Sequence, residues 1–309
     1  MTSGTAAAPA GSRQPRGLLG ALVVFLLLPF PALFLLGPLG GLLALARPSG
    51  LREWVSLGLV LLLAALSASA GVGLGQEVTL AAGAIFTGTF LALLVWRPGA
   101  PFRLAVVAAM TTAANVAGGC AWVGLGWEEV RAAIDRQWQE GMTLLLSGAG
   151  VGTPQETAMR EAIRLLAGVF PGVAFLGALA GGTLAAALAA RLGRGPVVLA
   201  PRPFHQFRFN DHLIWGALGS LALVMLPFPA PWSDLITNLL VIWIGLYVAR
   251  GAAIWLARSQ RWPTPVLVAL FLSAVLLLPY ALGALLILGL ADTWIEIRRE
   301  LPPPGGIPQ

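Results

Sequence analysis

Long apolar segments that recur along the whole chain restrict its fold more than any other feature of the sequence. A helix that crosses a bilayer needs about 20 apolar residues, and backbone groups in lipid are satisfied only within helices or closed barrels. With 58% hydrophobic and 10% charged residues, the chain has too little polar surface to cover a soluble globule. We therefore predict an all-α, polytopic transmembrane helix bundle in contact with the lipid bilayer. The apolar runs cover residues 18–46, 54–74, 78–96, 104–126, 162–190, 212–231, 235–257 and 264–296.

The first and last apolar runs are longer than one crossing requires. Each has about 30 residues, which as a straight helix would span about 45 Å against a hydrocarbon core of about 30 Å. Each also contains proline: Pro29, Pro31 and Pro38 in the first run, and Pro279 in the last. Proline removes a backbone donor and clashes with the preceding turn, so both runs are expected to bend or to form short helical hairpins. The bundle then has eight to ten membrane segments. A signal peptide cleaved after Ala46 is the alternative for the first run, but the apolar stretch is far longer than such peptides carry.

The basic residues, all of them arginine, predict the orientation of the chain. If the N-terminus is cytoplasmic and both long runs return to their starting side, every arginine cluster between the segments lies on the cytoplasmic face, as the positive-inside rule requires. We therefore predict a multi-pass plasma-membrane protein with both termini in the cytoplasm. A single transmembrane domain covers residues 17–300. The tails, residues 1–16 and 301–309, are expected to be disordered.

The connection over residues 127–161 is predicted to lie outside the cell. It carries six carboxylates against three arginines, the opposite of a cytoplasmic loop. Its apolar residues recur at helical spacing opposite its charged residues, which predicts an amphipathic helix. Such a helix lies on the membrane surface or caps the bundle. The apolar positions are Trp127, Val130, Ile134, Trp138 and Leu145.

Asn115 is the polar side chain predicted to lie deepest in the bundle. It stands near the middle of the run 104–126, close to Thr111 and Thr112. An amide at that depth needs partners in the bundle interior or in a wet cavity, because lipid offers none. These three residues are therefore the candidate substrate-binding group. The alternative is an interhelical hydrogen bond that only holds the structure together.

Asp292 is a carboxylate just inside the last apolar run, and its own helix offers it no positive charge one turn away. Glu296, one turn further on, is a like charge, and Arg299 lies two turns away. A partner on another helix is therefore expected, and Arg250 is the best candidate because it lies at a similar distance from the expected cytoplasmic end of its segment. The alternative is a carboxylate that reaches interfacial water alone.

The sequence does not contain the residue patterns that several other classes of function require. The arginines fall in short clusters between apolar runs, without an aromatic-interleaved basic face, so we expect no nucleic acid as partner. Cys120 is the only cysteine, which excludes an intrachain disulfide framework and a cysteine-rich metal site. His205 and His212 have no nearby third ligand, so we expect no metal. No nucleophile–base pair is apparent, and we therefore predict neither an enzyme nor a bound cofactor.

Three stretches in the last hundred residues carry a more specific pattern: "PFHQFRFNDHLIW", "TNLLVIWIGLYVARGAAIW" and "LGLADTWIEIRR". They resemble the YybS-like family of bacterial polytopic membrane proteins of unknown function, and the earlier part of the chain resembles that family mainly in layout. The positions that carry the resemblance are Trp215, Asn238, Tyr247, Gly251, Gly289, Asp292, Trp294 and Arg298.

That family is distantly similar to the substrate-binding membrane subunits of energy-coupling-factor vitamin transporters. The resemblance implies a protein that binds a small molecule from outside and docks on a partner subunit through an Ala-x-x-x-Ala stripe on its first helix. Here the first run lacks that stripe, although Ala185 and Ala189 have the same spacing further along. The leading hypothesis is a substrate-binding or permease-like transport subunit without its own ATPase. The alternative is a non-transporting envelope scaffold or assembly protein, which the scarcity of buried charge favours.

Overall fold

Helices joined by short connections make up most of what the computed structural model describes, namely residues 16–28, 30–46, 48–69, 73–97, 99–147, 153–192, 204, 207–229, 232–259 and 262–295. No strand occurs within these residues, as the apolar periodicity predicts. The helices are α1 (Arg16–Leu27), α2 (Leu33–Leu45), α3 (Leu51–Ser69), α4 (Leu74–Trp96), α5 (Pro101–Trp122), α6 (Trp127–Ser147), α7 (Thr153–Gly168), α8 (Phe170–Leu192), α9 (Ile214–Val224), α10 (Trp232–Ser259), α11 (Thr264–Leu276) and α12 (Leu278–Ile295), with a single 3-10 turn, η2 (Asp211–Leu213), ahead of α9.

Proline divides both long apolar runs. The first becomes α1 and α2, and the helix is interrupted between Leu27 and Leu33, where the sequence carries two prolines. The last becomes α11 and α12, which meet at Leu277 directly before the Leu278-Pro279 pair. Pro279 is the second residue of α12, where its missing N–H costs nothing, and its ring is incompatible with a continuous helix from α11. Pro38, by contrast, lies inside α2 without ending it.

A further break separates α7 from α8 and was not predicted. The run 162–190 was expected as one segment, but α7 ends at Gly168 and α8 begins at Phe170. Pro171 supplies the reason: it is the second residue of α8, where its missing N–H costs nothing, and its ring is incompatible with a continuous helix. The break leaves Phe170, at the start of α8, in contact with α6, where it belongs to the same apolar cluster as Val130 and Ile134.

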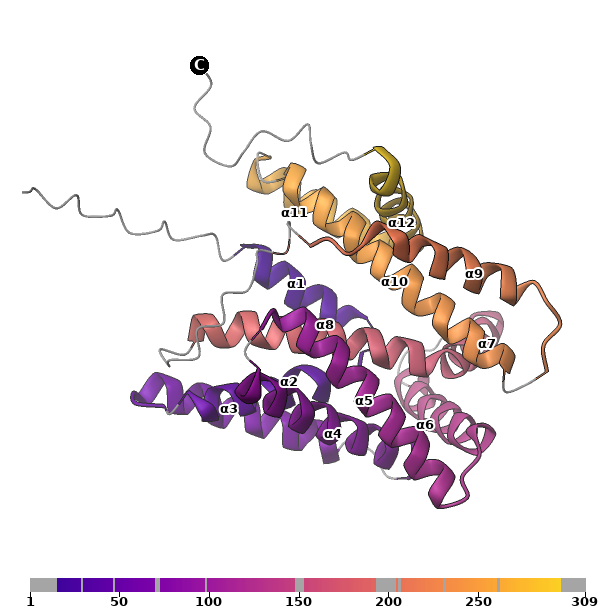
Figure 1. Ribbon diagram of the computed structural model, residues 1–309, viewed down its shortest axis with the longest axis horizontal. Helices are drawn as coiled ribbons and strands as arrows, with labels where there is room; N and C mark the ends of the chain where they lie inside the picture. The colour runs from indigo at the N-terminus through magenta and orange to yellow at the C-terminus, as the bar shows by residue number, and fades with distance from the viewer. Residues whose placement is uncertain are drawn as a thin grey trace, which may run out of the picture.

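The main core lies between α2, α4, α5 and α8. Phe34 of α2 meets Phe86 of α4 edge-to-face, with ring centroids 5.5 Å apart, and Phe86 stacks on Phe90. Gly181 of α8 lies directly against the backbone of α2 at Phe34, where any larger side chain would separate the two helices. Close approach through small residues is the usual packing mode of membrane helices, and it makes α8 the central helix of this group. In this group α2 and α5 pack directly on α8, while α3 packs on α2, and α4 lies against α2 and α5 (Figure 1).

The second group contains α9, α10 and α12, which Figure 1 places together beside α8. Gly251 of α10 and Gly289 of α12 face one another where these helices cross, and each packs on the other helix's backbone. A third glycine, Gly216, brings α9 against the indole of Trp243 on α10. The pair α6 and α7 covers one end of the molecule.

Six described helices are long and apolar enough to cross a membrane: α3, α4, α5, α8, α10 and α12. The apolar helices α2, α9 and α11 are shorter than a crossing. The outward faces of the spans carry large apolar side chains, such as Leu62 of α3, which is 56% exposed. Because soluble proteins do not expose such continuous apolar surface, these faces are the lipid-contacting surface of an integral membrane protein. Whether there are more than six membrane segments depends on how the shorter helices lie in the bilayer. The expected number of eight to ten segments therefore stays a prediction.

Candidate functional site

Asn115 does not face the bundle interior, and the prediction that placed it there was wrong. It is exposed on α5, where its amide donates to the carbonyl of Thr111 on its own helix at 2.8 Å. Thr112 is buried but bonds to Ala108 of the same helix at 2.8 Å. The three residues do not line the cavity described below, and their role in substrate binding stays a prediction. The physical reason is that the buried residues of α5 end at Thr112. The turns that follow are mostly exposed, and Cys120 on them packs against the apolar cluster under α6. A polar side chain can satisfy part of its hydrogen bonding on its own helix. The prediction considered only how far along the apolar run Asn115 lies, and not this possibility.

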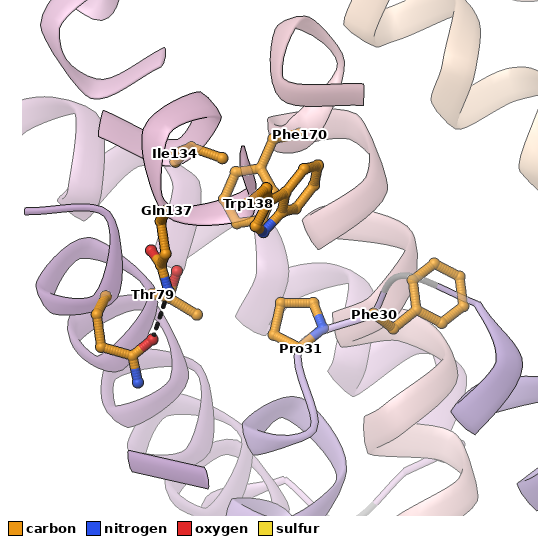
Figure 2. A pocket seen from close by; sticks show the side chains of 8 residues that line it. Phe30, Pro31, Thr79, Ile134, Gln137, Trp138 and Phe170 are labelled. Carbon is orange, nitrogen blue, oxygen red and sulfur yellow. Dashed lines mark hydrogen bonds between the residues drawn. The ribbon is translucent and has the colours of Figure 1, made fainter. Parts of the chain in front are cut away.

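A cavity of about 290 Å³ lies beneath α6, at the end of the bundle that α6 and α7 cover (Figure 2). One wall is aromatic, formed by Trp138 of α6 and Phe170 of α8. Opposite it lies the link between α1 and α2, at Phe30 and Pro31, and Ile134 adds an apolar surface from α6. The volume is at the lower end of the range for small-molecule sites. The arrangement is that of an apolar pocket with α6 as its roof.

The third wall of the cavity is polar and uncharged. Gln76 of α4 donates to the carbonyls of Ser67 and Ala68 at 3.1 and 3.2 Å, and its side-chain oxygen accepts from Gln137 of α6 at 3.1 Å. Because two carbonyl oxygens require the amide nitrogen of Gln76 to face them, the orientation of both glutamine amides is fixed by the network. Thr79 stands beside them and donates to Gly75 at 2.8 Å.

The aromatic wall depends on the break between α7 and α8. Trp138 and Phe170 meet edge-to-face with ring centroids 5.7 Å apart. Asn238 of α10 closes the break: its side-chain oxygen accepts from the Gly172 amide at 2.7 Å, and its nitrogen donates to the Gly168 carbonyl at 3.0 Å. Asn238 is only 6% exposed. It therefore satisfies both interrupted helix ends where water is scarce and fixes the position of Phe170.

A latch of polar contacts joins the start of α6 to the start of α10. The Trp127 indole donates to the Asp234 carboxylate at 2.9 Å, and the Arg131 guanidinium approaches the same oxygen at 3.4 Å. Asp234 lies one turn before Asn238 on α10, so that one face of α10 holds both the roof and the aromatic wall of the cavity. Sequence reasoning found α6 but not this contact, because nothing in the sequence joins residues 107 apart.

The side chains predicted to pair across two helices, Asp292 and Arg250, are in direct contact. Arg250 Nε lies 2.9 Å from Asp292 Oδ2, and a second guanidinium nitrogen donates to the Asp292 carbonyl at 3.1 Å. Both side chains are almost fully buried, at 0% and 1% exposure. Arg250 also bonds Asp211 at 2.7 Å and lies over the Phe209 ring at 5.4 Å. This buried cluster thus ties α10, α12 and the segment before α9 together.

Asp211 is the member of the buried cluster nearest to solvent, and Arg208 contacts it at 2.6 Å. Partial burial by itself raises the pKa of its carboxyl, but the hydrogen bonds and charges of Arg208 and Arg250 outweigh that effect and hold the pKa below its usual value. Asp211 is therefore ionised in the folded protein at neutral pH.

The remaining family-like positions divide into packing residues and surface residues. Tyr247 is 1% exposed and meets Phe209 edge-to-face at 5.1 Å, one turn from the crossing of Gly251 and Gly289. Trp215 and Trp294 are 71% and 68% exposed, as expected for aromatic side chains at a membrane interface. Arg298 lies outside the described residues, as does His205. No metal-ligand group occurs among the residues that the structure describes.

Together these features define a class: a multi-pass helical membrane protein with a buried ionic cluster on one side and a roofed, uncharged cavity on the other. The chain belongs to the family described as predicted membrane protein (DUF2232), whose model matches residues 18–293. No curated protein and no solved structure matches the chain. The family match covers all the elements that build the cavity and the buried cluster.

Proposed function

We propose that the protein is the substrate-binding or permease-like subunit of a membrane transport system, without an ATPase of its own. The observation that carries this proposal is the cavity beneath α6, which combines apolar walls with a few oriented polar groups, as small-molecule sites do. The expected similarity to substrate-binding subunits of energy-coupling-factor transporters is part of the same proposal, as is the YybS-like assignment.

Access to the cavity fits this role, because the cavity is only partly enclosed. Arg131 and Asp234 are 32% and 23% exposed, and a pair of this kind contributes about 0–1 kcal/mol. The Gln76–Gln137 hydrogen bond adds about 1 kcal/mol. The Trp127–Asp234 hydrogen bond and the apolar packing of Val130 and Ile134 also hold α6, so the proposed entry of a small ligand uses the open side of the cavity and does not require α6 to move.

The orientation that we propose places α6 on the outer face and both termini in the cytoplasm, with eight to ten membrane segments. A ligand then enters from outside, and a cytoplasmic or membrane partner subunit supplies the energy. No catalytic role is part of the proposal, since the cavity walls carry no nucleophile and base together.

Small molecules that co-purify with the protein test this function. Thr79→Met places a larger side chain in the cavity, and Thr143→Met is its matched control, because Thr143 makes the same one-turn hydrogen bond at 2.8 Å but lies on the exposed side of α6. Mass spectrometry of extracts should find a compound that wild type and Thr143→Met retain and Thr79→Met loses. Affinity purification from native membranes should also recover an ATPase pair.

The alternative is a non-transporting envelope scaffold, and one observation favours it. The charged contacts around Arg250 join helices to one another, and their residues do not line the cavity beneath α6. A scaffold needs such internal ties and no ligand. Identical extracts from all three proteins, together with recovery of cell-wall or secretion machinery, would support the scaffold and reject transport.

A further inference from the structure

The lining of the cavity beneath α6 bears on which ligand it would take, and the inference drawn from it rests on the proposed function. We propose that the cavity binds a neutral, ring-bearing molecule whose polar end accepts one hydrogen bond and donates another, as a carboxamide does. Four observations carry it: the uncharged lining, the occupation of nearby charges by protein partners, the aromatic wall and the pairing of one donor with one acceptor.

No residue that lines the described cavity is charged. The nearest cation on the same face of α6, Arg131, is held by Asp234. The first turn of α8 starts at the cavity wall and would attract an anion, but its Gly172 amide already donates to Asn238. An ionic ligand would therefore lose part of its hydration without gaining a counter-charge, which is unfavourable.

The aromatic wall suits a ring. Trp138 and Phe170 present their edge-to-face pair to the cavity, and Pro31 faces them across it. Aromatic groups favour stacked or edge-to-face neighbours 4.5–7 Å away. A flat ring between these surfaces satisfies that preference, whereas a flexible polar chain would leave the wall without a partner.

The polar wall determines what the other end of the ligand must carry. Gln137 uses one N–H on Gln76, and its second N–H has no acceptor among the described residues. The Thr79 hydroxyl donates its proton to the Gly75 carbonyl, so that its oxygen can still accept a hydrogen bond. Thr79 lies three residues after Gln76 on α4, and therefore on the same face of that helix, while Gln137 bonds Gln76. One donor and one acceptor thus line the same wall, and a carboxamide carries the groups to bind both.

Binding of three compounds of nearly equal size tests the inference: benzamide, benzoate and benzylamine. At pH 7 they are neutral, anionic and cationic. Their effect on the melting temperature of the purified protein would be titrated over a concentration range. Benzamide should stabilise the wild type, while benzoate and benzylamine should bind at least tenfold more weakly. Gln137→Leu should weaken benzamide binding about fivefold, the equivalent of one neutral hydrogen bond. Gln139→Leu, on the side of α6 that contacts Arg160, should leave it unchanged.

The outcomes separate this inference from the proposed function. Stronger binding of benzoate or benzylamine than of benzamide, or equal benzamide binding by Gln137→Leu and wild type, overturns the ligand class and leaves transport standing. If no compound binds but Thr79→Met still loses a co-purifying molecule, the ligand class is again wrong. If neither assay finds a ligand, both proposals fail.

Discussion

Replacing Arg250 by glutamine should destabilise the protein more than any other single change in the buried cluster. The guanidinium is fully buried and contacts two carboxylates on two other elements. Its removal takes away the cation in contact with Asp292, which is 1% exposed, and breaking a buried pair in this way costs about 3–5 kcal/mol. Asp292→Asn should cost less, about 1–3 kcal/mol, because Arg250 keeps Asp211 and the Asp292 carbonyl. Asp211→Asn, at the more exposed end, should cost about 0–1 kcal/mol.

The double mutant provides the sharper measurement. If Arg250 and Asp292 act as a pair, the combined variant should be about 1–3 kcal/mol more stable than the sum of the two single changes predicts. Reversible unfolding in mixed micelles gives these free energies, and Arg258→Gln is the matched control, since Arg258 is an exposed arginine near the end of the same helix. Strict additivity, or equal losses from Arg258→Gln and Arg250→Gln, would refute the reasoning.

Four other predictions follow from the fold. Asn238→Leu should cost about 2–3 kcal/mol in unfolding free energy, because it leaves the Gly172 amide buried without an acceptor; a neutral result would contradict its capping role. Asn115→Leu should change that free energy by less than about 0.5 kcal/mol, since Asn115 is exposed, and a loss comparable to that of Asn238→Leu would show a missing partner. Reporter fusions at residue 149 and after residue 309 should report the outer and the cytoplasmic face, respectively, and the opposite signals would overturn the orientation. The lowered pKa of Asp211 means that its contribution to stability is fully present above its unfolded pKa near 3.8 and is lost as the pH falls through the folded value. Asp211→Asn should therefore flatten the loss of stability as the pH falls below the unfolded pKa of Asp211, and identical pH profiles for wild type and variant would exclude this.

Local signals in the sequence predicted the helices but not the cavity. Apolar run lengths and prolines located the helical segments and the division at Leu277, because both act through the backbone of neighbouring residues. The partner of Asp292 could be inferred because an unpaired carboxylate in an apolar run restricts the choice to a few arginines. Gln76 and Gln137, in contrast, are ordinary polar residues in sequence, and they become a site wall only when α4 and α6 meet. Asn115 illustrates the same limit: depth along a helix can be estimated from sequence, whereas the direction a side chain faces depends on which neighbours the helix acquires.

Because Asn238 caps both helix ends at the α7–α8 break, this part of the structure can be completed only after α10 has been synthesised. Asn238 is synthesised 66 residues after Gly172, so α8 emerges with its first-turn amide and the Gly168 carbonyl still uncapped. These groups must remain near water or other polar partners until α10 arrives. The aromatic wall at Phe170, and with it the cavity, is therefore completed only late in synthesis, and a chain arrested before residue 238 would insert most of its helices without forming the pocket.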